Sequence, residues 1–309
     1  SLACVNSIFE QPWWLDAVAP GIWDEVIVEQ SGEVIARLTF VKTKRLGFKL
    51  IGLPDYTQTT SCWVKQTGAK NAKKFSRDKD LITELIKQLP KGYNVDLRLD
   101  HKCDYLLPFF WAGFSVRVNY SYRLENIENT EALWSGLAEN IRRAIRKALR
   151  TLHVEDNRTM DDLIEMRNKS FHRQGRNSCA NRELLLRLDK VLLDHNARKL
   201  LCAVDDLNRI HAAAYFVYDE NTCYYLIGGG DPELRNSGAA SLLLWEGMRF
   251  ASTVSKAFDF EGSMIEDIER FFRAFGGTPT PYYRVTRLNP ALSFADYMKP
   301  KVKRILGWK

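Results

Sequence analysis

The 309-residue chain lacks the features that define several large classes of protein. No apolar run approaches the roughly 18 residues that a membrane-spanning helix needs, which excludes integral membrane insertion. Ten Pro and 18 Gly are too few for a fibrous or low-complexity chain, and 12% aromatic residues are too many for a disordered one. No G-x-S-x-G motif is present, so a serine hydrolase has no support. These absences leave a globular chain of about two domains at roughly 100–200 residues each.

Cysteine and histidine are also sparse. The six cysteines are scattered and include no C-x-x-C pair, so neither a zinc site nor a disulfide scaffold is expected. The five histidines show no ligand spacing, and we therefore expect no metal site. Reduced, unpaired thiols are typical of the cytoplasm, which is the expected location.

Positive charge is in moderate excess, because 45 Lys and Arg outnumber 38 Asp and Glu to give a net charge of +7. This surplus favours contact with phosphate groups, whether in a nucleic acid, a nucleotide-bearing cofactor or an anionic lipid surface. Dedicated nucleic-acid binders usually concentrate basic residues more densely.

Two stretches of the chain resemble each other. Residues 26–54 and 201–230 each contain three alternating apolar runs separated by short polar turns, which predicts three antiparallel strands in a meander. Within these stretches, Ile35 matches Ile210 at an offset of 175 residues.

The likeness continues downstream, where a helix, a strand and a second helix are predicted in each stretch. Asp96 matches Asp259 at an offset of 163 residues, and Phe110 matches Phe272 at an offset of 162. The nearly constant offset predicts a tandem duplication. The alternative is that alternating strands look alike in any α/β protein. The predicted elements are 80–89, 94–99 and 105–114 in the first copy and 239–252, 256–260, 265–275 and 282–288 in the second.

The fold class expected from this pattern is α/β (α+β), with each copy a mixed, largely antiparallel sheet flanked by helices. We expect an N-terminal domain over residues 1–119 and a C-terminal domain over residues 120–288, with the tail at 289–309 returning to the first. A single helix over 129–150 is expected to lead into the second copy, followed by helices at 161–171 and 181–196.

The second copy contains a turn that is suited to binding phosphate. Its meander ends in three glycines, and the segment Arg235-Asn236-Ser237-Gly238-Ala239-Ala240 then opens a long helix. A helix start built from small residues presents unpaired N–H groups and the positive end of the helix dipole to an anion. The alternative is an ordinary helix start that is capped by Asn236 or Ser237. The residues expected to bind a cofactor here are Arg235, Ser237, Gly238, Ala239 and Ala240.

This succession of strand, R-x-x-G-x-A turn, helix, strand and helix resembles the acyl-CoA-binding core of GNAT-superfamily acyltransferases. The stretches 258–262 and 271–277, together with the basic helix at 140–148, resemble the Fem-like transferases, whose chains contain two GNAT-type folds in tandem. The resemblance implies two tandem GNAT-like domains. It also implies acyl-CoA as the co-substrate, with acetyl-CoA as the first expectation, bound through its pyrophosphate at the amides of the turn.

Two residues are predicted to be catalytic. Glu261 follows a buried-type strand and is the expected general base, whereas the alternative is a solvated strand-end carboxylate. Asp259 should point to the opposite face of that strand, and its match to Asp96 favours a structural role. In Fem-like proteins a Lys usually follows the Phe at 272 and is implicated in stabilising charge. Arg273 stands there in this chain and keeps the charge as a planar fork.

Basic residues at 3–4 spacing predict a positively charged helix face before the second meander. This face is expected to contact tRNA or the phosphates of a bulky substrate, and a solvated helix face is the alternative. Its residues are Arg142, Arg143, Arg146, Lys147 and Arg150.

Three hypotheses for function follow. The first is an acyltransferase that moves an acyl group from acyl-CoA to an amine or hydroxyl of a small-molecule, peptide or sugar acceptor. The second is a Fem-type aminoacyltransferase that uses aminoacyl-tRNA on a cell-wall precursor. The third is a non-catalytic duplicate that binds nucleic acid or protein.

Overall fold

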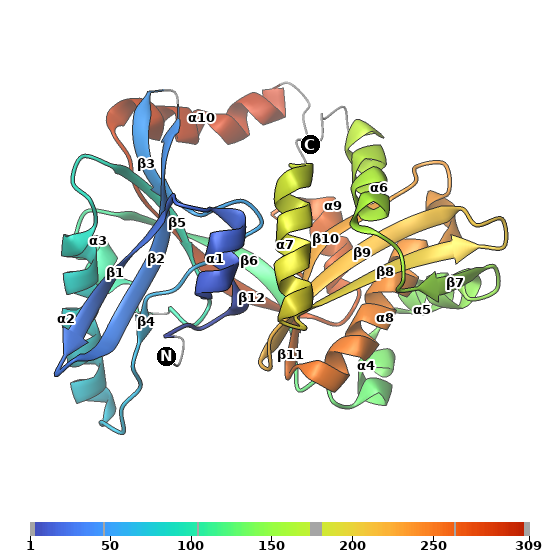
Figure 1. Cartoon of the computed structure of the whole chain (residues 1–309), viewed down its shortest axis with the longest axis horizontal. Coiled ribbons are helices and arrows are strands. Elements are labelled where there is room, and N and C mark those ends of the chain that lie inside the picture. The colour runs from blue at the N-terminus through green and yellow to red at the C-terminus, as the bar shows by residue number, and fades with distance from the viewer. Residues whose placement is uncertain (1–3, 46, 104, 174–180, 263, 306–309) are drawn as a thin grey trace. The chain divides into compact units, whose positions relative to one another are not determined.

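The computed structural model describes residues 4–45, 47–103, 105–173, 181–262 and 264–305 (Figure 1). The chain divides into two compact units. Unit 1 contains residues 1–120 and 281–309, and unit 2 contains residues 121–280.

The sheet of unit 1 is built on the meander that the sequence predicts. β1 (Trp23–Gln30), β2 (Glu33–Arg45) and β3 (Phe48–Gly52) are antiparallel neighbours. β5 (Asn94–Leu99) lies parallel to β3, and β12 (Thr278–Arg287) lies antiparallel to β5. The sheet is therefore mixed and largely antiparallel, as expected.

Helices and short elements complete unit 1. The helix expected from residue 80 begins earlier, as α2 (Asn71–Gln88), and buries Leu81 and Leu85 at helical spacing. The helix expected at 105–114 is only α3 (Leu107–Trp111), which has Pro108 in its first turn. The other elements are η1 (Ile8–Glu10), α1 (Pro12–Val18), β4 (Trp63–Val64) and α10 (Pro290–Ile305).

Unit 2 repeats the arrangement. β7 (Leu152–Glu155), β8 (Arg198–Asp205), β9 (Ile210–Tyr218) and β10 (Thr222–Gly230) are antiparallel neighbours in that order. β11 (Ala257–Asp259) lies parallel to β10. The second predicted meander is thus present as β8, β9 and β10.

Helices cover both faces of this sheet (Figure 1). Alternate residues of β9 face opposite sides, and they are buried on both. Phe216 packs where a side chain at Gly247 of α8 would stand, whereas the Tyr215 hydroxyl donates to Asp189 of α7. The helical elements are α4 (Thr130–Gly136), α5 (Glu139–Ala148), α6 (Met160–Arg173), α7 (Arg182–Asp194), η2 (Arg235–Ser237), α8 (Ala239–Val254) and α9 (Glu266–Arg273).

The single helix expected over 129–150 is wrong, because the chain breaks between α4 and α5. Leu137 and Ala138 have extended backbone angles, and the Ala138 N–H donates to the Ala274 carbonyl at 2.9 Å. A Cβ at Gly276 would lie 2.8 Å from the Gly136 carbonyl oxygen, so the two glycine backbones pack closely. A contact between segments far apart in the sequence therefore interrupts a locally favourable helix.

The two copies have exchanged their last strands. The sequence pattern places the strand predicted over 282–288 in the second copy, but β12 pairs with β5 in unit 1, with Tyr283 opposite Leu99. β6 (Ser115–Glu125) follows the first copy along the chain, yet its last residues pair with β11 in unit 2, with Leu124 opposite Phe258.

A matching ion pair fixes each exchanged strand. In unit 1, the guanidinium of Arg284 on β12 makes two 2.7 Å contacts with the Asp96 carboxylate on β5. In unit 2, Arg123 on β6 donates through Nη1 to Asp259 on β11 at 2.8 Å. Asp96 and Asp259 are the pair that the sequence offset matches, so each copy uses its aspartate to hold the incoming strand. The resulting architecture confirms the predicted fold class, while the expected boundaries at 119/120 and 288 stay predictions about independent domains.

Candidate functional site

The sheet of unit 2 opens beyond residue 224. β10 and β11 are paired over only three positions, from Thr222 opposite Ala257 to Tyr224 opposite Asp259. β10 then continues to Gly230 with β9 as its neighbour on the other side. Beyond Tyr224, no described strand pairs with the edge of β10 that faces away from β9.

A cavity of about 440 Å³ lies at this opening. Its walls come from the end of α6, from β9 and β10, and from α8 and α9. Ser170 of α6, Tyr225 of β10, Leu243 of α8 and Ile268 of α9 represent the four sides. Its volume lies in the range of about 300–1,000 Å³ that is usual for small-molecule sites.

Three of the five residues predicted to bind the cofactor line this cavity. Arg235, Ala239 and Ala240 are lining residues. Ala240 is exposed at the start of α8, where the first N–H groups of the helix have no intrahelical acceptor. Ser237 and Gly238 are not among the described residues of the lining. The structure therefore brings the helix start, its small residues and an arginine together around one space.

Gly238 does not line the cavity but allows the start of α8 to pack closely against α5. Its φ of +85° is the left-handed conformation that glycine adopts without strain. A Cβ there would lie 2.4 Å from the Ala144 carbonyl oxygen of α5. Lys147, one turn further along α5, donates from Nζ to the Asn236 carbonyl at 2.6 Å. Gly238 and Lys147 thus position the turn.

Tyr225 is the cavity residue that the sequence analysis missed. It follows directly after the last residue of β10 that pairs with β11. The hydroxyl occupies the place that a side chain at position 228 would take, since a Cβ on Gly228 would lie 1.6 Å from it. Burial raises the pKa of Tyr225 to about 12, so its hydroxyl stays protonated and can donate a hydrogen bond. A tyrosine three residues before a strand glycine is the only sequence signal, and it is weak.

Asp231 lines the cavity and Asp205 contacts the lining residue His211, and both aspartates have basic neighbours. Lys169 lies 2.9 Å from Asp231 Oδ2, and this contact lowers the pKa of the Asp231 carboxyl. His211, which is 8% exposed, lies with Nε2 3.1 Å from Asp205 Oδ2. Hydrogen bonds from Arg209 and His211 hold the pKa of Asp205 well below its usual range. The cavity therefore presents no unpaired carboxylate from these two aspartates to an incoming anion.

The predicted base Glu261 lies two residues beyond the end of β11, at a strained backbone position. Its φ is +55°, which is uncommon for a residue other than glycine. Its N–H donates to Asp259 Oδ1 at 2.8 Å, so the buried Asp259 holds the turn that carries Glu261. Asp259 is structural, and Glu261 is absent from the described lining of the cavity.

The predicted Arg273 lies on the exposed side of α9. Its side chain is 61% exposed, and Nε lies 2.9 Å from Glu269 Oε1. The Tyr122 hydroxyl also donates to Glu269, and this hydrogen bond raises the pKa of Tyr122. Like Glu261, Arg273 is absent from the described lining of the cavity, and the catalytic roles of both residues stay predictions.

The members of the predicted basic face differ in their contacts with the described residues. Arg142 and Arg146 both contact Glu139, at 3.0 and 3.3 Å. Lys147 holds the turn before α8, as described above. Arg143 and Arg150 are exposed, and Arg150 lies beyond the end of α5.

Over the described ranges, no group of three or more His, Cys, Asp or Glu is placed to hold a metal ion. None of the described helices is both long enough and apolar enough to span a bilayer.

Comparison with known families gives a match within unit 2. Residues 135–263 match the family model described as an acetyltransferase (GNAT) domain. This segment contains η2, α8, β10 and β11, and hence most of the cavity wall. Residues 135–263 of unit 2 are therefore similar to a GNAT domain, as the R-x-x-G-x-A turn predicts. No curated protein sequence matches the chain.

Solved structures share the fold of the whole chain. FemX matches with a TM-score of 0.70 at 14% identity, covering 93% of this chain and 94% of its own. A tandem GNAT protein from the clavulanic acid biosynthesis pathway matches with a TM-score of 0.54 at 10% identity, covering 85% and 82%. L-PGS from Bacillus licheniformis matches with a TM-score of 0.54 at 14% identity, covering 87% of each chain. The predicted tandem GNAT-like fold of Fem-like type is thus confirmed.

Proposed function

We propose that unit 2 transfers an acyl group from acyl-CoA, with acetyl-CoA as the first candidate, to an amine or hydroxyl of a small-molecule, peptide or sugar acceptor. The observation that carries this proposal is the cavity at the opening between β10 and β11, which reaches the start of α8. The match of residues 135–263 to an acetyltransferase domain supports it.

The two ends of the cavity suit the two ends of the donor. The diphosphate would lie against the N–H groups of the first turn of α8, where it would compete with Ser237 Oγ for the Ala239 N–H, with Arg235 adding a charge-assisted contact. The extended pantetheine arm would lie along the open edge of β10, where its amides replace the missing strand. The thioester would then lie toward Tyr225.

The chain offers groups for each proton that moves in the reaction. The acceptor nitrogen or oxygen attacks the thioester carbonyl and loses its proton to a base, for which Glu261 remains the candidate. The carbon–sulfur bond breaks, and the CoA thiolate is stabilised by a hydrogen bond from the protonated Tyr225. Arg273 would balance negative charge during transfer.

The test is acetyl-CoA binding to Ala240→Glu, with Ala240→Gln as the size-matched control. A carboxylate in the first turn favours the α8 dipole, so the fold should be unaffected or slightly stabilised. The same charge would repel the donor diphosphate and displace it from the N–H groups. We expect the affinity to fall by about 100-fold in Ala240→Glu and by only a few-fold in Ala240→Gln. Isothermal titration calorimetry measures both, and melting curves without ligand check the fold.

Equal acetyl-CoA affinity in the wild type and in Ala240→Glu would remove the start of α8 from the donor site. A melting temperature that no acyl-CoA raises, but that nucleic acid does, would instead favour a non-catalytic binding protein.

A second candidate is transfer from aminoacyl-tRNA, and the position of α5 favours it. Lys147 of α5 contacts the turn before α8, so the basic face adjoins the proposed donor site. Arg143 and Arg150 are exposed there and would contact an RNA backbone. This candidate requires that aminoacyl-tRNA stabilise the protein and that CoA not do so.

A further inference from the structure

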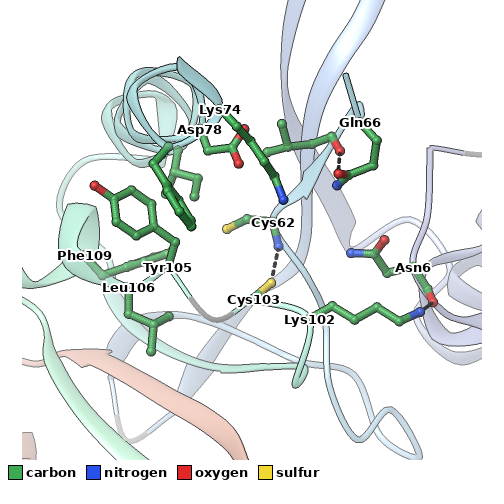
Figure 2. Close-up of a pocket in the computed structure, with 13 residues that line it drawn as sticks. Asn6, Cys62, Gln66, Lys74, Asp78, Lys102, Cys103, Tyr105, Leu106 and Phe109 are labelled. Atoms are coloured by element: carbon green, nitrogen blue, oxygen red, sulfur yellow. Dashed lines mark hydrogen bonds between the residues drawn. The ribbon is translucent and has the colours of Figure 1, made fainter. Parts of the chain in front are cut away.

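Unit 1 contains a cavity of its own, of about 380 Å³, that the proposed transfer does not use (Figure 2). Its walls are α2, β4 with the residues on either side of it, the described residues between β5 and α3, and Phe109 of α3. This volume is again in the usual range of about 300–1,000 Å³ for a small ligand.

In unit 1, a segment of the chain itself occupies the place that is open in unit 2. β3 pairs with β5 at two positions, the second of which sets Ile51 opposite Val95. Further along β5, Thr60 forms a parallel bridge with Leu99, and its N–H donates to the Arg98 carbonyl at 2.9 Å. The edge of β5 is therefore paired there, and the cavity of unit 1 is not a second copy of the proposed donor site.

Lys74 brings a positive charge into this cavity. It extends from α2 toward Cys62 and is half-buried (Figure 2). Among the described residues, no carboxylate oxygen lies within 4.0 Å of its ammonium, which lies 6.0 Å from the centre of the Phe75 ring. The charge of Lys74 is therefore available to a ligand that enters the cavity.

The one acidic side chain in the described lining already has partners. Asp78 stands one turn beyond Lys74 on α2 and is only 15% exposed, with Arg77 Nη1 at 3.9 Å from its Oδ1. It takes part in at least one further interaction. Because Arg77 already opposes the charge of Asp78, the charge that a ligand can neutralise in this cavity is the positive one.

Hydrogen-bonding groups face Lys74 across the cavity. The Asn6 side-chain amide points into the space (Figure 2). Lys102 is held at the rim, where its ammonium donates to the Asn6 carbonyl at 2.9 Å. An anionic group beside Lys74 would therefore also find an amide donor and a second cation nearby.

The other end of the cavity is apolar and aromatic. The rings of Phe75 and Tyr105 lie 5.3 Å apart and form one wall. Leu106 and the buried Phe109 continue it. Phe75 is 41% exposed, so an apolar group in the cavity would cover surface that now faces water, and this burial favours binding.

The floor between the two ends is neutral. The Cys62 N–H donates to Cys103 Sγ at 3.1 Å (Figure 2). The interaction with Cys62 and burial raise the pKa of the Cys103 thiol well above its usual range, so it carries no charge at neutral pH. This thiol therefore adds no negative charge that would oppose a bound anion.

We propose that this cavity binds a monocarboxylate that carries an aromatic ring, its carboxylate at Lys74 and Asn6 and its ring against Phe75 and Tyr105. One available ammonium and one amide donor complement a single negative charge. A cationic ligand of the same shape would instead meet Lys74 as a like charge, so the site discriminates against it. Binding here involves no covalent step.

Calorimetric titration of the full chain with four probes tests whether charge and ring are both recognised. 3-Phenylpropanoate carries both, 3-phenylpropan-1-ol lacks the charge, 3-phenylpropan-1-amine reverses it, and propanoate lacks the ring. We expect 3-phenylpropanoate to bind about tenfold or more tightly than each of the others. Equal binding of any of the other probes, or no binding of 3-phenylpropanoate, would overturn the proposal.

Matched variants on α2 assign the site. Lys74→Gln should weaken 3-phenylpropanoate binding by about tenfold. Lys73→Gln changes an exposed neighbour outside the described lining and should leave the affinity unchanged. Asp78→Asn removes a charge of the same sign as the ligand, so the affinity should stay the same or rise by a few-fold.

Equal effects of Lys73→Gln and Lys74→Gln would refute the site, and so would a loss of about tenfold in Asp78→Asn. Melting curves without ligand check that each variant is folded. The readout is binding to unit 1, so it is independent of whether unit 2 transfers an acyl group.

Discussion

Arg123→Met is expected to lower the free energy of unfolding by about 3–5 kcal/mol. Arg123 and Asp259 face each other across β6 and β11, with side chains only 5% and 7% exposed. Removing the guanidinium leaves a buried carboxylate without its counter-charge. The hydroxyl of Ser121 and the N–H of Glu261 would still donate to Asp259, but neither supplies a positive charge. Urea denaturation measures the loss.

A double variant distinguishes a lost charge pair from lost packing. Arg123→Met combined with Asp259→Asn removes both charges but keeps an amide oxygen to accept from Ser121 and Glu261, and we expect it to recover part of the stability. Arg249→Met removes an exposed arginine that lies 3.0 Å from Glu246, and it should cost less than about 1 kcal/mol. A loss in Arg123→Met no larger than that in Arg249→Met would contradict a structural role for the pair.

The duplication could be predicted from the sequence only in part. The match of Asp96 to Asp259 was visible, because both residues follow their own meander at a nearly constant offset. Their arginine partners were not visible, since each stands on the strand of the other copy. Arg284 lies 188 residues from Asp96, and Arg123 lies 136 residues from Asp259. The apolar periodicity of a segment predicts whether it forms a helix or a strand. It does not predict which distant strand becomes its neighbour, because that depends on the energy of pairing between the two strands.

The candidate site was predictable to a similar degree. The turn at Arg235–Ala240 could be found because the helix start and its small residues are contiguous in sequence. The role of Tyr225 could not, since it depends on β10 and β11 separating after Tyr224. The glycines at the end of β10 were also ambiguous. A Cβ on Gly229 would lie 2.3 Å from the Arg167 nitrogen of α6, so that glycine serves helix packing and not ligand approach.

Gly238→Ala is expected to lower the free energy of unfolding by about 2–5 kcal/mol. About 1–2 kcal/mol of this comes from placing a Cβ at a φ of +85°. The rest comes from the clash with the Ala144 carbonyl oxygen, which would lie 2.4 Å from the new Cβ. The oxygen belongs to the α5 backbone, so it cannot move without shifting the helix.

Gly92→Ala separates the two contributions. Gly92 has a similar φ of +78° and no heavy atom within 4 Å of the added Cβ, so only the strain remains. We expect a loss of about 1–2 kcal/mol there. A Gly238→Ala loss no greater than that would mean that α5 does not press on the turn. The comparison also decides how the proposed donor site is probed. A substitution at Gly238 weakens the fold together with any ligand contact. Ala240 is the exposed second residue of α8, so Ala240→Glu changes the charge at the helix start and leaves the packing with α5 intact.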